Sequence, residues 1–216
     1  MPHQKESSWQ IREIFLKYGT RKYFSTGQIL VEKGQPANLS CYIAKGQVRT
    51  FCMNTEGDHV TLFYIEPDNM ICSESLVPGS LVNVSVEAIT PVEMYVIPSQ
   101  QFRLLWEAQG FPIEELIQSL VNRLCLLSDY ICCAHFKENK QKVAYFLHSC
   151  YDRFGPVIPY TNEQIADIAG LSRVSVNRIL NSFSKEGLLE LEYKKIKILD
   201  VERLSGIFNS VGYFID

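Results

Sequence analysis

The chain has 216 residues and a mass of 24.8 kDa, so it has room for one large domain or two of about 100 residues each. With 46% hydrophobic and 21% charged residues, its composition is that of a folded globular protein and excludes a largely disordered chain. The net charge of −3 excludes a generally basic surface, so any nucleic-acid interface must depend on a local group of residues.

Membrane, secretory and disulfide-rich classes also fit poorly. No uninterrupted apolar run exceeds five residues, whereas a membrane span needs about 20. The first residues lack the basic segment, apolar stretch and cleavage site of a secretory signal, so we expect a cytoplasmic protein without a membrane partner. Seven cysteines without a CxxC pair indicate reduced, mostly buried thiols.

The first part of the chain has a β pattern. Residues 23–97 form short runs rich in Val, Ile, Phe, Tyr and Thr, interrupted by Gly or Pro about every 8–12 residues, which is typical of an all-β sandwich or barrel. The segment Asn54–Gly57 between residues 48–53 and 60–65 predicts a hairpin with Gly57 at a positive φ.

After Pro112 the apolar period changes from two to alternating three and four, which predicts a helix over residues 113–134, about 33 Å long. One unbroken stripe of this helix contains Ile113, Ile117, Leu120, Leu124, Leu127, Ile131 and Ala134. Such a stripe favours pairing with the same stripe of a second copy, and the alternative is packing on the chain's own β domain. A second row, on another face, could meet the β domain and contains Leu116, Arg123, Leu126, Tyr130 and Cys133.

Residues 135–140 are polar and predict a hinge, and residues 142–154 predict a further helix that ends at Gly155. Up to residue 136 the chain has 10 Lys or Arg against 14 Asp or Glu, and from residue 137 it has 11 against 10. The second part is therefore the less acidic one.

Residues 160–187 have the spacing of a helix-turn-helix. Thr161 or Asn162 caps a first short helix, and Gly170 supplies a left-handed turn residue. The small Ala166 allows a close crossing, and the apolar residues Leu171, Val176 and Ile179 fill the wedge between the helices.

Ser172 caps the second helix, whose outer face carries hydrogen-bond donors suited to DNA. The candidate DNA contacts of this face are Arg173, Val174, Ser175, Asn177 and Arg178. Residues 188–191 and 196–199 predict a hairpin, with Lys194 and Lys195 at its tip as phosphate contacts. The alternative is a three-helix packing module with solvated arginines and lysines.

The sequence resembles the CRP/FNR family of bacterial transcription regulators from about Tyr23 to Leu204. The matching residues are Gly27–Ile29, Gly34, Tyr42, Ile43, Gly46–Val48, Ala88, Val96–Pro98 and Gly170–Arg178. The resemblance implies an α+β chain with a cyclic-nucleotide-binding-type β-roll, a central dimerisation helix and a winged helix-turn-helix. We expect these parts to occupy residues 1–112, 113–138 and 139–216.

Departures from the family pattern bear on the effector. Members that bind cyclic AMP hold its phosphate with a Gly-Glu turn and an Arg-Ser or Arg-Thr pair, but here the pair positions are Val82 and Asn83. A buried phosphate without a cation is disfavoured, so we expect a different effector. Iron–sulfur members carry clustered N-terminal cysteines, and residues 1–40 contain none.

The residues expected to line the effector pocket are Cys72, Ser73, Glu74, Val82, Asn83, Val84, Leu126 and Tyr130. They suit a small organic molecule, and the pattern resembles the branch of the family that senses aromatic compounds, where a Val also stands at the position of Val174. The alternative is a β-roll that is filled by its own side chains and has no effector.

Two other functions compete with this interpretation. Cys132, Cys133 and His135 could sense metal or oxidation, although adjacent cysteines of a helix point about 100° apart. An oxygenase-type metal enzyme needs several histidines on neighbouring strands, and only His59 lies in the β region. We therefore expect a homodimeric regulator without enzymatic activity or cofactor, whose partners are double-stranded DNA, RNA polymerase and a small-molecule effector.

Overall fold

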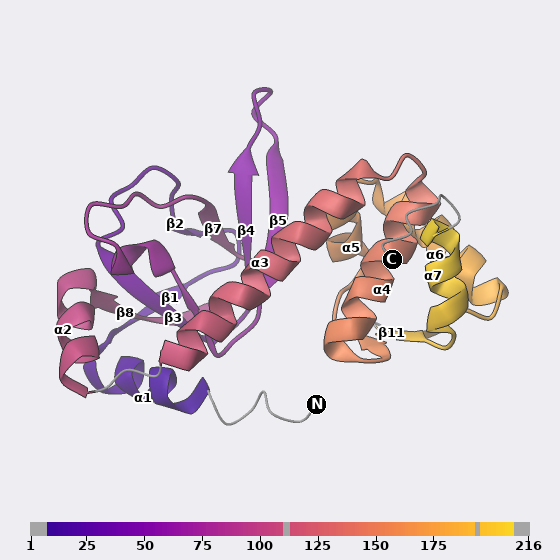
Figure 1. Cartoon of the computed structure of the whole chain (residues 1–216). Coiled ribbons are helices and arrows are strands. Elements are labelled where there is room, and N and C mark those ends of the chain that lie inside the picture. The colour runs from indigo at the N-terminus through magenta and orange to yellow at the C-terminus, as the bar shows by residue number, and fades with distance from the viewer. Residues whose placement is uncertain (1–7, 110–112, 193–194, 210–216) are drawn as a thin grey trace. The chain divides into compact units, whose positions relative to one another are not determined.

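The computed structural model describes residues 8–109, 113–192 and 195–209, and the chain forms two compact units, residues 1–124 and 125–216 (Figure 1). The boundary falls inside one long helix, α3 (Ile113–His135), which confirms the helix predicted over residues 113–134. The predicted α+β class, with strands first and a helical second part, is also confirmed.

The first unit contains two four-stranded antiparallel sheets, in the orders β1-β8-β3-β6 and β2-β7-β4-β5. Their strands are β1 (Thr20–Phe24), β2 (Ile29–Val31), β3 (Leu39–Lys45), β4 (Val48–Met53), β5 (His59–Ile65), β6 (Asn69–Ile71), β7 (Ser85–Ala88) and β8 (Val92–Pro98). The predicted hairpin joins β4 to β5. Gly57 has a φ of 88° there, and the Asn54 side-chain oxygen accepts hydrogen bonds from the backbone of Glu56 and Asp58.

Three further helical segments belong to the first unit: α1 (Ser8–Tyr18), η1 (Ser73–Leu76) and α2 (Ser99–Gln109). Neither α1 nor α2 was predicted from the sequence, where the first expected helix begins at residue 113. In α1 the signal was short, because only Ile11, Ile14 and Phe15 follow the helical spacing. These residues are buried against the sheet, and Phe15 stacks on Tyr42 of β3 with ring centroids 5.5 Å apart.

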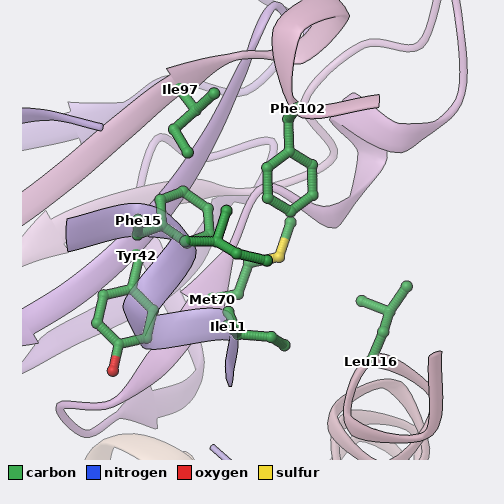
Figure 2. Close-up of a cluster of buried hydrophobic side chains, with 8 residues drawn as sticks. Ile11, Phe15, Tyr42, Met70, Ile97, Phe102 and Leu116 are labelled. Carbon is green, nitrogen blue, oxygen red and sulfur yellow. The ribbon is translucent and has the colours of Figure 1, made fainter. Parts of the chain in front are cut away.

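This contact belongs to a hydrophobic cluster that joins α1, α2, α3 and the first sheet (Figure 2). Its buried members are Ile11, Ile14, Phe15, Tyr42, Met70, Ile97, Phe102 and Leu116. Leu116 comes from the second row of α3, so this part of the row meets the β-roll as predicted. The cluster therefore fixes the start of α3 on the first unit.

The described residues of the second unit contain the end of α3, four more helices and a three-stranded sheet. These elements are α4 (Asn139–Phe154), β9 (Val157–Ile158), α5 (Asn162–Ala169), α6 (Arg173–Lys185), β10 (Leu189–Glu192), β11 (Lys195–Ile198) and α7 (Val201–Asn209). In the sheet β11 lies between β10 and β9. The helix-turn-helix and its hairpin are thus present where the sequence predicts them.

The predicted start of α4 was wrong by three residues, and with it the extent of the hinge. The helix begins at Asn139 rather than Lys142, so only residues 136–138 separate α3 from α4. The apolar period begins only at Val143, but the polar first turn is helical too. Lys140 pairs with Glu186 at 3.0 Å and Gln141 is buried, so tertiary contacts hold this turn.

Within the second unit, the end of α3 is attached to α4 by polar contacts. Asp129 accepts a hydrogen bond of 3.2 Å from the Tyr145 hydroxyl and forms an ion pair with Arg153. Cys133 is buried and donates to the backbone carbonyl of Lys142 at 3.4 Å. Lys142 lies near the start of α4 and Arg153 in its last turn, so these contacts are distributed along α4.

Candidate effector site and DNA interface

The predicted effector residues of the β-roll occupy two neighbouring segments. Cys72, Ser73 and Glu74 lie where β6 passes into η1, and Val82, Asn83 and Val84 precede β7. The two segments meet where the Asn83 backbone N–H donates to the Glu74 carboxylate at 3.3 Å. Cys72 and Val82 are buried, Asn83 is exposed, and the other three are half-buried.

A cation that the sequence analysis did not assign to the pocket lies beside these residues. Arg123 of α3 donates to the Ser73 hydroxyl at 3.1 Å and to the backbone carbonyl of Met70. Burial lowers the pKa of Arg123, and the nearby Glu74 carboxylate acts in the opposite direction. Arg123 belongs to the row of α3 that was predicted to meet the β-roll, but only the fold shows which residues it meets.

The remaining pocket assignments stay predictions. Leu126 and Tyr130 are partly exposed and lie on the portion of α3 that belongs to the second unit. A shallow surface depression of the first unit contains none of the predicted residues. It is lined by Tyr23, Phe24, Ser25, Lys45, Pro91, Val92 and Glu93.

The apolar stripe of α3 is largely uncovered. Five of its seven predicted members, Ile113, Ile117, Leu120, Leu124 and Ile131, are between 43% and 65% exposed. Leu127 is half-buried and Ala134 is exposed. Single exposed apolar residues are common on surfaces, but a continuous row of them marks an interaction surface. By length and composition alone α3 could also cross a membrane, although Arg123 and Asp129 both make polar contacts within the protein.

The helix-turn-helix formed by α5 and α6 is held by capping interactions that follow directly from its sequence. The Thr161 hydroxyl accepts from the Gln164 backbone, and the Gln164 side chain accepts from the Thr161 backbone. Gly170 ends α5 with a φ of 63°, and the Ser172 hydroxyl accepts from the Ser175 backbone at the start of α6. Thr161, and not Asn162, is therefore the cap.

Packing between α5 and α6 largely follows the predicted wedge. Ala166, Val176 and Ile179 are buried, whereas Leu171 is only half-buried. Leu171 contributes instead through its backbone N–H, which donates to the Ala166 carbonyl at 2.9 Å. The turn between the two helices is thus closed by backbone hydrogen bonds.

The outer face of α6 presents most of the predicted DNA contacts to solvent. Arg173, Val174 and Arg178 are exposed, and Val174 reaches 78%. Ser175 and Asn177 are half-buried. The Asn177 side-chain oxygen accepts a hydrogen bond of 2.6 Å from Asn162, so part of its hydrogen-bonding capacity is used within the head.

The hairpin after α6 pairs Glu192 with Lys195 at its last described position. Lys195 is exposed, and Lys194 lies outside the described residues. Lys197 forms an ion pair with Glu190 at 3.3 Å across the hairpin. The exposed ammonium group of Lys195 remains the candidate phosphate contact of this hairpin.

The rival metal or redox site at the end of α3 does not form one cluster. Cys132 is exposed, while Cys133 is buried, which raises its pKa to about 11. The His135 ring nitrogen Nδ1 lies 2.8 Å from the Ile131 carbonyl. In the described ranges, no group of three or more His, Cys, Asp or Glu residues could hold a metal ion.

Each of the two units matches the model of a known protein family. Residues 21–109 match the cyclic nucleotide-binding domain, and residues 141–207 match the Crp-like helix-turn-helix domain. The cyclic AMP receptor protein of Thermus thermophilus is 23% identical over 196 residues, covering 90% of this chain and 91% of the relative. A CRP-like cAMP-activated global transcriptional regulator of Mycobacterium tuberculosis is 27% identical, covering 84% of this chain and 85% of the relative.

A solved structure also shares the fold. A variant of CooA from Carboxydothermus hydrogenoformans aligns with a TM-score of 0.73 and 22% identity, covering 89% of each chain. The Mycobacterium tuberculosis relative is named a transcriptional regulator, and the two matching family models are a nucleotide-binding domain and a helix-turn-helix domain, which agrees with the expectation of a regulator rather than an enzyme.

Proposed function

We propose that this chain, which belongs to the CRP/FNR family of DNA-binding transcription regulators, acts as a cytoplasmic homodimer that binds an inverted-repeat operator in response to a small organic effector. The observation that supports the proposal most strongly is that one helix carries both the exposed apolar stripe and Arg123, which touches the β-roll. An effector in the β-roll and a partner subunit would therefore act on the same helix.

The effector proposal rests on the residues around Arg123. The guanidinium group of Arg123 donates to a hydroxyl and to a backbone carbonyl, both neutral, and the Glu74 carboxylate nearby accepts from Asn83. A guanidinium group in such surroundings favours an effector with an acidic group, such as an aromatic carboxylate or phenolate. The buried side chains of Cys72 and Val82 provide apolar surface for the rest of that molecule.

A thermal-shift screen of small organic acids tests this part, because a ligand that prefers the folded state raises Tm by mass action. A hit should lose its shift in Arg123→Met and keep it in Arg103→Met. Arg103 is the matched control, since it also donates to a backbone carbonyl of η1, that of Ser75, at 3.2 Å. Equal loss in both variants would refute the assignment of Arg123.

Cyclic nucleotides are the competing effectors, because both sequence relatives are named for cyclic AMP. Arg123 supplies one cation, but the pair positions hold the buried Val82 and the exposed Asn83. We therefore expect millimolar cyclic AMP and cyclic GMP to leave Tm and DNA affinity unchanged. A saturable shift with either nucleotide would show that Arg123 is sufficient for the phosphate.

The DNA-binding proposal assigns different tasks to α6 and to the hairpin. Arg178 is exposed on α6 and suits a bidentate contact to guanine, which contributes about 1–3 kcal/mol of discrimination against other bases. Val174 cannot accept a hydrogen bond, so it would meet a thymine methyl group or no base-specific group. Lys195 would contact phosphate, which carries no sequence information.

Operator selection from a library of inverted repeats, followed by binding at two salt concentrations, tests these assignments. Arg178→Ala should reduce preference at one base pair in each half-site. Lys195→Ala should weaken all sequences alike and reduce the salt dependence. Lys185→Ala, at the exposed far end of α6, is the control for a general loss of positive charge. If Arg178→Ala weakened every sequence equally, base reading would have to be reassigned to Arg173 or Asn177.

A further inference from the structure

The two helices of the DNA-binding head are joined by a contact between two side-chain amides. Asn162 is the first residue of α5, and Asn177 lies in the second turn of α6. The Asn162 NH2 group donates to the side-chain oxygen of Asn177, with 2.6 Å between nitrogen and oxygen. Both side chains are half-buried. The orientation of the Asn177 amide is therefore set from α5 and not by α6 alone.

The backbone on both sides of this contact is held in place. The Thr161 hydroxyl and the Gln164 side chain fix the first turn of α5 by two reciprocal hydrogen bonds, and Gln164 is buried. Val176, which precedes Asn177, is completely buried. Because the backbone is fixed, the side-chain torsions are the freedom that remains to Asn177, and its hydrogen bond to Asn162 restricts them.

An asparagine amide has two chemically different ends, an oxygen that accepts hydrogen bonds and an NH2 group that donates them. A free side chain can turn either end towards DNA by half a turn about its last torsion. In this head the oxygen of Asn177 faces Asn162. The one buried side-chain nitrogen or oxygen without a partner among the described residues is an oxygen of Glu115, so the NH2 group of Asn177 is not sealed inside the head without an acceptor. Asn177 therefore has a donor to present.

We propose that Asn162 is a positioning residue that makes Asn177 present a hydrogen-bond donor to one base pair in each half-site. This inference rests on the DNA binding proposed above. In the major groove guanine presents two acceptors, N7 and O6, whereas cytosine presents the N4 donor. A donor on Asn177 favours guanine and is opposed by cytosine, because two donors that face each other form no hydrogen bond. A bidentate contact to adenine needs the amide oxygen too, and that oxygen faces Asn162.

Substitutions at Asn162 test the proposal through base preference, which a merely structural residue would not redirect. The contacted position is the base pair at which Asn177→Ala loses preference, and there the unsubstituted protein should prefer guanine to cytosine about tenfold. Asn162→Ala frees the Asn177 amide, so this preference should largely disappear. Asn162→Asp introduces a carboxylate that only accepts, so Asn177 must turn its NH2 group inwards and its oxygen towards DNA. The preference should then reverse to cytosine.

Two controls separate this reversal from other effects of the substitutions. Asn181→Asp adds the same charge to an exposed position of α6, one helical turn beyond Asn177, and should weaken all sequences alike while guanine stays preferred. Adding Asn162→Ala to Asn177→Ala should change the preference at this position no further, because Asn162 acts through Asn177. A guanine preference that persists in Asn162→Asp or in Asn162→Ala would overturn the proposal.

A measurement without DNA distinguishes failure of this inference from failure of the proposed function. Nitrogen-15 relaxation of the side-chain NH2 groups in the whole unbound protein should give Asn177 a high order parameter, which falls in Asn162→Ala and is unchanged in Asn181→Asp. An Asn177 NH2 group that is equally mobile with and without Asn162 would refute the positioning role even if operator binding were intact. An ordered Asn177 in a protein that binds no operator would instead refute the DNA-binding function, and base reading with it.

Discussion

The dimer proposal predicts that one charge in the middle of the apolar stripe separates the subunits. Leu124 is 65% exposed in the protomer, so Leu124→Asp should change the folding free energy of the isolated subunit by only about 0.5 kcal/mol. Burying a leucine contributes about 1.5–3 kcal/mol, so covering the exposed part of both copies contributes about 2–4 kcal/mol to a symmetric dimer.

The substitution removes that contribution and also brings two unpaired carboxylates into the interface, which costs a few kcal/mol more. A total loss of about 5 kcal/mol weakens the dimer between 10³-fold and 10⁴-fold, since about 1.4 kcal/mol corresponds to a factor of ten. Sedimentation velocity at micromolar concentration should therefore show a monomer. The single change is preferable to one that includes Leu127, because Leu127 is already half-buried in the protomer.

Asn122→Asp is the control for this experiment. Asn122 is exposed and precedes Leu124 by two positions. At about 100° per helical residue its side chain points about 200° away from that of Leu124, so the substitution places the same charge on the opposite face of α3. It should remain a dimer. A Leu124→Asp protein that sediments as a dimer would refute the stripe as the interface, whatever its affinity for DNA.

Two further predictions concern the turn of the DNA-binding head and the start of α3. Gly170→Ala should destabilise the head by about 1–2 kcal/mol because φ is +63°, although a methyl group has space there. The control Gly206→Ala, in α7, should be neutral or stabilising. Equal changes in Tm for the two variants would contradict the left-handed backbone as the cause. Burial raises the pKa of Glu115 in the folded protein above its ordinary value of 4.5. The folded protein therefore loses stability as the pH rises from 4.5 to this raised pKa, and the loss remains at higher pH. Glu115→Gln should therefore be stabilising at pH 7 and lose that advantage below pH 4.5, as measured by urea unfolding; the same difference at both pH values would exclude ionisation as the cause.

Local sequence signals were sufficient for the parts of the protein whose structure depends on neighbours in the chain. The cap at Thr161, the left-handed Gly170 and the hairpin at Gly57 each depend on residues within about four positions. The stripe of α3 has an unambiguous helical period, because it extends over six turns. The order of β-roll, long helix and helix-turn-helix could therefore be predicted without the structure.

Other features depend on residues that only the fold brings together. The helix α1 has a short apolar signal, and its place is decided by the packing of Phe15 on Tyr42. The first turn of α4 has no apolar period, and it is held by the pairing of Lys140 with Glu186. Periodicity cannot report such contacts, since both partners are distant in the sequence.

The first unit also combines features that the sequence predicts with features that only the fold decides. The family resemblance assigns Val82 and Asn83, neither of them a cation, to the positions of the phosphate-binding pair, and the helical period predicts Arg123 on a row of α3 that could meet the β-roll. Only the tertiary structure decided that Arg123 reaches Ser73. The physical reason is that a hydrogen bond between side chains depends on distance in space, and packing of the start of α3 on the first unit creates that distance.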